Sequence, residues 1–278
     1  MTMIRQNGLS LVELMIALLL SSLLTVAATQ LFLVNRQTEN LQMGISSVQD
    51  NGRFAFDYVS RAFMEAGHGQ PDAIVPFILD GTPFNDTPGD AEISDGAKYD
   101  QVVFEVVNGR DCLGGTMTGY KRYHVRTDGG LNRLSCDALA YSETTNESGE
   151  LETGYTQASS GPLIDNVEAF QVMYGVDFDQ PNDEGYGLAD LYTNATQLKA
   201  IESDVTAGAA RIVSVRFSVL IASDGRVTLE TETAPDSITL LDKTFSQGNG
   251  SADINFEDGR LYRTYSSTVA LRNLVSTL

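Results

Sequence analysis

Oxygen-bearing side chains gather on one short stretch in the second half of the chain. Such hard ligands, on a glycine-containing loop that follows a strand, suit Ca²⁺, which takes about six to eight oxygens. The spacing begins like a D-x-D-x-[DN]-G calcium loop, but Pro181 and the late Gly185 break it. A solvated acidic turn is therefore a competing interpretation that fits at least as well. The candidate ligands are Asp177, Asp179, Asn182, Asp183 and Asp190.

Motifs for other chemistry are missing from the sequence. It contains no G-x-S-x-G, H-E-x-x-H or G-x-G-x-x-G pattern. The stretch Gly114–Lys121 approaches a phosphate-binding loop, but Tyr120 stands where the lysine is required, so a hairpin or loop is expected. The two histidines, His68 and His124, lie far apart in the sequence. We therefore expect no enzyme activity, and no cofactor other than the possible Ca²⁺.

The two cysteines, Cys112 and Cys136, are too far apart for a C-x-x-C redox pair. If the chain is exported, a disulfide between them is the natural interpretation, contributing roughly 3 kcal/mol by loop closure. Two unrelated buried thiols are the alternative.

The charge balance is strongly acidic. The chain has 37 Asp and Glu against 18 Lys and Arg, which gives a formal net charge of −19 over 278 residues. No basic stretch offsets this charge, so bulk electrostatics argue against a nucleic acid as the main partner.

A long apolar run, Leu9–Val34, stands near the start of the chain and contains one acid, Glu13. An acidic side chain inside a membrane costs roughly 2.5–3.5 kcal/mol on insertion scales. A secretory peptide cleaved near Ala28 fits poorly, because this apolar run is longer than such peptides carry and Glu13 would have no role in one. A plain signal anchor fits the length but also leaves the acid unexplained.

The stretch Gly8-Leu9-Ser10-Leu11-Val12-Glu13-Leu14 resembles the N-terminal signal of type IV pilins and of type II secretion pseudopilins. The resemblance implies that a prepilin peptidase cuts between Gly8 and Leu9 and methylates the new amine on Leu9. Leu9 departs from the usual Phe or Met of these families. The implied role of Glu13 is to pair with the amine of a neighbouring subunit, because burying the pair is tolerable where burying either charge alone is not.

The apolar run and Glu13 are predicted to lie on one long helix. The absence of proline before Pro71 and the amphipathic spacing of Phe56, Val59 and Phe63 predict one helix over Leu9–Ala66, loosened near its glycines. Gly67-His68-Gly69 then ends it. We expect residues 1–8 to be a leader, 9–34 a membrane or filament-core helix, 35–66 its amphipathic continuation, and 67–278 a β-rich head.

Beyond the helix, short apolar alternations predict strands that form one antiparallel sheet against it. The polar segment Ser142–Gly161 is expected to be a surface loop. The predicted strands are Gln101–Val107, Tyr120–Arg126, Val167–Val176, Arg211–Ala222 and Tyr262–Leu271.

Three blocks narrow the resemblance: Asn51–Gly67, Ile164–Asp179 and Thr268–Leu274 are similar to the PilW family of minor type IV pilins. The resemblance implies an α+β pilin-like fold and a minor pilin in a tip complex that primes pilus assembly. Its partners would be other minor pilins, the major pilin, a large tip adhesin and the prepilin peptidase. The chain would sit in the inner membrane with a periplasmic head, and at the pilus or cell surface after assembly, serving adhesion, twitching motility or DNA uptake.

Three alternatives stay open. A minor pseudopilin of a type II secretion system would have the same kind of N-terminal signal and helix, and the neighbouring genes would distinguish it from a pilin. A membrane-anchored periplasmic enzyme or binding module would tolerate Glu13→Leu and Gly8→Ala. An adhesin with receptor-binding acidic loops would bind saturably through its head alone.

Overall fold

A computed structural model describes residues 10–67, 77–78, 98–145, 151–201, 205, 209–227, 234–248, 250 and 253–271 of the chain. The helices are α1 (Leu11–Glu65), α2 (Ala195–Ala200) and the short 3₁₀ helix η2 (Phe256–Asp258). The strands are β1 (Phe77–Ile78), β2 (Val102–Arg110), β3 (Thr116–Asp128), β4 (Leu131–Thr145), β5 (Leu151–Asp165), β6 (Val167–Asp177), β7 (Leu191–Thr193), β8 (Arg211–Ala222), β9 (Ser237–Leu240), β10 (Lys243–Ser246) and β11 (Tyr262–Ala270).

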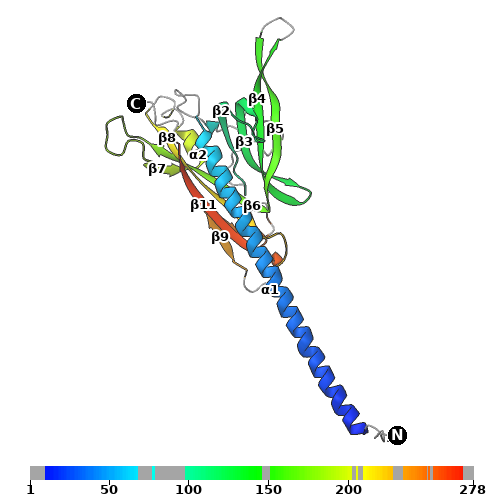
Figure 1. The fold of residues 1–278 in the computed structure, drawn as a ribbon. Coiled ribbons are helices and arrows are strands. Elements are labelled where there is room, and N and C mark those ends of the chain that lie inside the picture. The colour runs from blue at the N-terminus through cyan, green and yellow to red at the C-terminus, as the bar shows by residue number, and fades with distance from the viewer. Residues whose placement is uncertain are drawn as a thin grey trace.

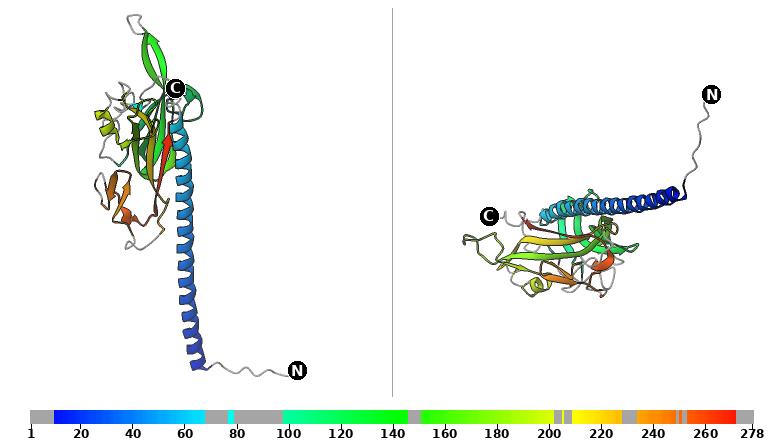
Figure 2. Two further views of the ribbon diagram at one scale, coloured as in Figure 1. Left: turned by 90° about the vertical axis from the view of Figure 1, so that its left-hand side faces the viewer. Right: turned by 90° about the horizontal axis from the view of Figure 1, so that it is seen from below.

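Helix α1 is continuous for 55 residues, and its first half projects away from the head (Figure 1). It ends where the sequence predicts, because Gly67 takes a left-handed φ of 75°. The strands lie mainly against one side of its second half (Figure 2). The predicted α+β, pilin-like architecture is therefore present.

The strands form two main antiparallel sheets rather than the single sheet expected. One has the order β1-β2-β3-β4-β5 and the other β11-β8-β6-β7, with β9 and β10 as a separate pair. The break lies at Asn166, the one residue between β5 and β6, which has a positive φ of 59°. Asparagine tolerates this conformation, so the chain leaves one sheet and enters the next within a single residue.

Phe63 joins the helix to both sheets. Its ring centroid lies 6.3 Å from that of Tyr123 on β3 and 5.6 Å from that of Phe217 on β8, both at steep interplanar angles. The opposite face of the second sheet is also covered, because Leu220 of β8 packs with Phe245 of β10. Burial on both faces explains why Arg211–Ala222 is almost wholly buried.

The two glycines expected to loosen α1 instead allow close packing. A Cβ on Gly44 would lie 2.2 Å from Val227, and one on Gly52 would lie 2.1 Å from the ring of Tyr265. The Tyr265 hydroxyl also donates to the Val48 carbonyl at 3.1 Å. The head therefore abuts the helix backbone at both positions.

The prediction of a loop over Ser142–Gly161 is wrong. The described parts of this stretch belong to β4 and β5, which pair from Thr145↔Leu151 to Arg133↔Asp165 and extend beyond the rest of the head (Figure 1). Hydrophobic alternation marks a strand with one buried face, and where burial is described in the outer part of this hairpin, at residues 154–158, every residue is intermediate or exposed.

Candidate functional site

Glu13 lies in the first turn of α1, on the part of the helix that the head does not cover. Every residue from Ser10 to Met43 is exposed, including Leu11 at 76% and Leu24 at 68%. This helix is long and apolar enough to cross a membrane. A carboxylate near a helix N-terminus is favoured by the helix dipole, but the dipole supplies no counter-ion.

Four hydroxyl side chains in the same run, those of Ser21, Ser22, Thr25 and Thr29, bond to carbonyls of their own helix, whereas Glu13 makes no such bond. The hydroxyls of Thr25 and Thr29 each donate to the backbone carbonyl four residues earlier, at 2.8 Å. Such bonds let hydroxyl groups sit in an apolar layer at low cost. Glu13 makes no hydrogen bond or ion pair within the described part of the chain, so any partner must come from elsewhere. The predicted cleavage residues, Gly8 and Leu9, lie outside the described residues.

A disulfide joins Cys112 and Cys136, with their Cα atoms 5.7 Å apart. It ties the loop between β2 and β3 to β4, as the interpretation of an exported chain predicts. The Cys112 amide also donates to the Ser159 hydroxyl of β5 at 3.1 Å. The loop is therefore held at two points.

Three of the five predicted calcium ligands gather. Asp177, Asp179 and Asp190 each offer an oxygen within 4.8 Å of the others. Local desolvation, followed by repulsion from Asp190 and Asp177, raises the pKa of Asp179. The Arg211 side chain already brings a positive charge 3.6 Å from Asp177.

The other two predicted ligands take different roles. The Asp183 carboxylate accepts the Gln180 amide at 3.0 Å, and Asn182 adopts a positive φ of 84° in the turn. Neither belongs to the three-carboxylate group. Ca²⁺ binding therefore stays a prediction that rests on three side chains.

Sequence reasoning missed a buried polar network on β3, β4 and β5. Asp137 accepts from Arg122 at 2.7 Å and from Ser160 at 2.6 Å, and its oxygen lies 2.8 Å from Nε2 of His124. Burial alone would raise the pKa of Asp137, but the hydrogen bonds from His124, Ser160 and Arg122 outweigh it and hold the pKa well below its usual range.

The same network shows why these residue types do not form a nucleophilic triad. Ser160 bonds to the carboxylate and not to the imidazole, so no base is placed to activate it. The register Arg122↔Asp137 was the only signal that could have revealed the network, and it requires knowing how β3 and β4 pair. His68 lies outside the described residues.

Comparison with known proteins agrees with these features. The family model described as type IV pilus-assembly protein W matches residues 122–273, more than half of the chain. A second model, the prokaryotic N-terminal methylation motif, matches residues 3–29 and so spans Glu13.

No curated protein matches the chain. Among solved structures, a type IV-like pilin from Thermus thermophilus is 13% identical with a TM-score of 0.36, over 82% of this chain and 98% of its own. The family match over the head and the methylation motif over the helix carry the assignment: the chain belongs to the PilW family and is a minor pilin in type IV pilus assembly.

Proposed function

We propose that this minor pilin works in a complex of minor pilins at the filament tip that primes pilus assembly. The observation that carries the proposal is the division of α1 into an apolar half that is exposed all round and a second half that packs one face against the head. A bare apolar helix is stable only against lipid or against similar helices. A subunit that passes from membrane to filament meets both surroundings.

Processing comes first in this proposal. The prepilin peptidase removes residues 1–8 and methylates the amine of Leu9. Residues 9–34 then anchor the protein in the inner membrane, residues 35–66 continue the helix, and residues 67–278 form a periplasmic head. A disulfide suits that oxidising compartment.

Glu13 then selects the register of assembly. Its carboxylate lies in the apolar layer with no counter-ion among the described residues of its own chain, and the amine created at Leu9 would lie in the same layer. Pairing Glu13 with the amine of a neighbouring subunit neutralises both charges at one axial offset. A single buried polar group fixes the register of coiled coils in the same way.

The role is structural rather than catalytic, and its partners are other minor pilins, the major pilin and a tip adhesin. The match to the pilus-assembly family over the head favours this role over that of a type II secretion pseudopilin. The net charge of −19 gives no support to direct binding of a nucleic acid.

The test compares three full-length variants in the native host: Glu13→Leu, Glu13→Gln and, as a matched control, Glu39→Gln, which also removes an exposed acid from α1. Immunoblots of sheared filaments and of membranes separate assembly from insertion. We expect both Glu13 variants to be processed and to stay in the membrane, with incorporation reduced at least tenfold. Wild-type incorporation of Glu13→Leu would contradict the pairing role.

A further inference from the structure

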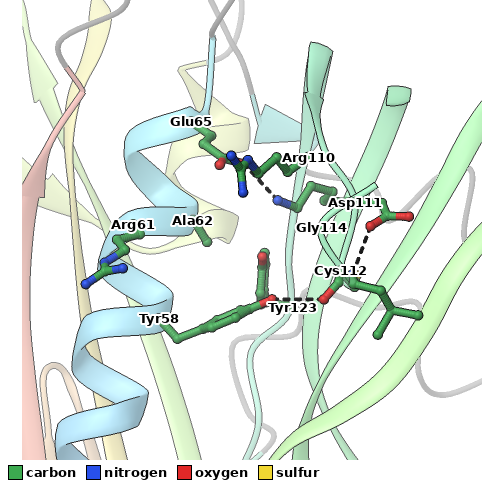
Figure 3. Close-up of a pocket in the computed structure, with 11 residues that line it drawn as sticks. Tyr58, Arg61, Ala62, Glu65, Arg110, Asp111, Cys112, Gly114 and Tyr123 are labelled. Atoms are coloured by element: carbon green, nitrogen blue, oxygen red, sulfur yellow. Dashed lines mark hydrogen bonds and ion pairs between the residues drawn. The ribbon is translucent and has the colours of Figure 1, made fainter. Parts of the chain in front are cut away.

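A pocket of about 660 Å³ opens between the last turns of α1 and the loop that joins β2 to β3 (Figure 3). Tyr58, Ala62 and Glu65 line it from the helix. Residues 110–114 and the β3 side chains Lys121 and Tyr123 line it from the sheet. It lies apart from Glu13, near the other end of α1.

Lys121 is a nearly buried cation in the wall of this pocket. Its side chain is 4% exposed, and its ammonium donates to Glu65 at 2.9 Å. It also lies over the rings of Phe104 and Tyr123, at 5.8 and 5.9 Å from their centroids. An ammonium carries three N–H donors, and among the described residues only Glu65 accepts from this one. Two donors are therefore left at the pocket.

The Tyr123 hydroxyl is a second buried donor in the wall of the pocket. Tyr123 is 0% exposed, and its hydroxyl has no hydrogen-bond partner of acceptable geometry among the described residues. The nearby Tyr58 hydroxyl donates to the Cys112 carbonyl at 3.2 Å, and its oxygen is a close but poorly aligned acceptor for Tyr123. Burial raises the pKa of Tyr123 well above its ordinary value, so the group stays a neutral O–H donor. A buried donor without a well-aligned acceptor is costly, which points to a better acceptor that arrives with a ligand.

The charges around the pocket favour an anion. Arg61 and Arg110 line the pocket (Figure 3), are exposed, and form no ion pair with any described residue. Of the two acids, Glu65 is paired with Lys121, and Asp111 accepts the Leu113 and Gly115 amides at 2.9 and 2.7 Å. The pocket is thus a local cationic site on a chain of net charge −19.

The walls of the pocket are held in place before any ligand binds. The disulfide fixes Cys112 against β4, and the Asp111 side chain fixes the turn after it. Little ordering is then lost on binding, which favours affinity.

We propose that this pocket binds a carboxylate carried on the polypeptide of a neighbouring subunit, from an Asp or Glu side chain or a chain end. Lys121, Tyr123 and Arg110 would donate to it. At about 1.5 Å per residue, Glu65 lies about 46 Å beyond Val34 along α1, so lipid headgroups do not reach the pocket. That last step rests on the proposed membrane anchoring; the carboxylate chemistry does not.

The test uses the full chain in detergent and a fluorescein-labelled acetyl-tetraglutamate peptide, followed by fluorescence anisotropy. The matching tetraglutamine peptide with an amidated C-terminus, which carries no carboxylate, and free glutarate, as an unlabelled competitor, separate a peptide-borne carboxylate from a neutral peptide and from a small acid. The double variant Arg61→Gln/Arg110→Gln removes both free cations. Its matched control, Arg53→Gln/Arg126→Gln, removes one exposed cation from the same helix and one from β3.

We expect saturable binding of the acidic peptide, weakened at least tenfold in the Arg61/Arg110 variant and unchanged in the control. Tyr123→Phe sharpens the test, because removing an unpaired hydroxyl should leave the fold intact or raise its melting temperature while weakening the peptide about fivefold. Equal binding of both peptides, equal loss in both double variants, or no saturable binding would overturn the proposal. If glutarate competed at the concentration at which the peptide itself binds, the ligand would be any small carboxylate and not one carried on a polypeptide. Failure of the Glu13 proposal would leave these results unchanged.

Discussion

Along α1, every residue from Ser10 to Met43 is exposed, whereas Val48, Ala55, Val59 and Phe63 are 0% exposed. Both stretches are helical and rich in apolar residues, yet only the second has its cover within the same chain. Burying one large apolar side chain stabilises a protein by roughly 1.5–3 kcal/mol. The many exposed apolar side chains of the first stretch gain this stabilisation only if lipid or another protein covers them.

The difference shows where the function lies. Substitutions in the second half of α1 should act on the stability of the head, and substitutions in the first half should act on insertion and assembly. We therefore propose Glu13, the single acid of the apolar run Leu9–Val34, as an assembly residue, because it makes no contact that supports the described fold.

The largest expected effect is loss of the function of the first half of α1, with no change in the stability of the head. Gly8→Ala should prevent cleavage and remove the protein from filaments, because the resemblance places the cut after this glycine. The melting temperature of the head should not change. Immunoblots for the shift on cleavage and for filament content measure it, with the neighbouring Asn7→Ala as the control. Normal filament content in the Gly8 variant would contradict the assignment of the site.

Phe63→Ala tests the second half. This ring packs against Phe104, Tyr123 and Phe217, so its removal should lower the free energy of unfolding by about 3–5 kcal/mol. Phe32→Ala, on the bare half at 57% exposure, should change it by less than about 0.5 kcal/mol. Denaturant titration of both variants in detergent gives the comparison, and similar losses would erase the distinction between the two halves.

The disulfide should matter only to the head. Cys112→Ala/Cys136→Ala should destabilise it by about 3 kcal/mol, because the reduced chain regains the freedom of the 24-residue separation. Reductant should lower the melting temperature of the wild type and leave that of the variant unchanged. A wild type insensitive to reductant under unfolding conditions would contradict a structural bond.

The Asp137 network should make the head acid-sensitive. The pKa of Asp137 is depressed in the fold, so its contribution is present above the unfolded value of about 4 and is lost as pH falls toward the folded value. Asp137→Asn should cost about 2 kcal/mol at pH 7, the worth of a hydrogen bond to a charged group, and should flatten the loss in acid.

Unfolding titrations between pH 7 and pH 3 measure this effect. The exposed Asp57→Asn is the matched control and should keep the wild-type profile. If the Asp137 variant lost stability in acid as the wild type does, the network would not be the cause of the acid sensitivity.

The smallest expected effect comes from Ca²⁺. If Asp177, Asp179 and Asp190 bind the ion, a calcium concentration of tenfold Kd should stabilise the head by about 1.4 kcal/mol. Asp179→Asn should abolish the shift and Asp183→Asn should keep it, because Asp183 lies outside the group. No rise in melting temperature in the wild type would leave the solvated acidic turn as the correct interpretation.

Patterns that depend on near neighbours in the sequence predicted the structure well. Helix α1, the apolar strand Arg211–Ala222 and the stop at Gly67 follow from local spacing and glycine chemistry. The cysteine pair followed from the export signal rather than from local geometry.

Features that depend on register or on distant packing could not be predicted. The β4–β5 hairpin has polar strands whose pairing depends on partner backbone groups, and the split of the sheets depends on one backbone angle at Asn166. Gly44 and Gly52 were wrongly predicted to loosen the helix. The residues that pack against them, Val227 and Tyr265, lie far away in the sequence, so local spacing does not reveal the contacts. The pocket at Lys121 and Tyr123 needs a helix and a sheet brought together.

The most direct test of the central claim is the intact mass of the protein purified from its native membrane without reduction. The account predicts loss of the first eight residues, the gain of one methyl group on Leu9, and a deficit of two hydrogens for the Cys112–Cys136 bond. An intact N-terminus, or a cut near Ala28, would contradict the proposed processing of this chain.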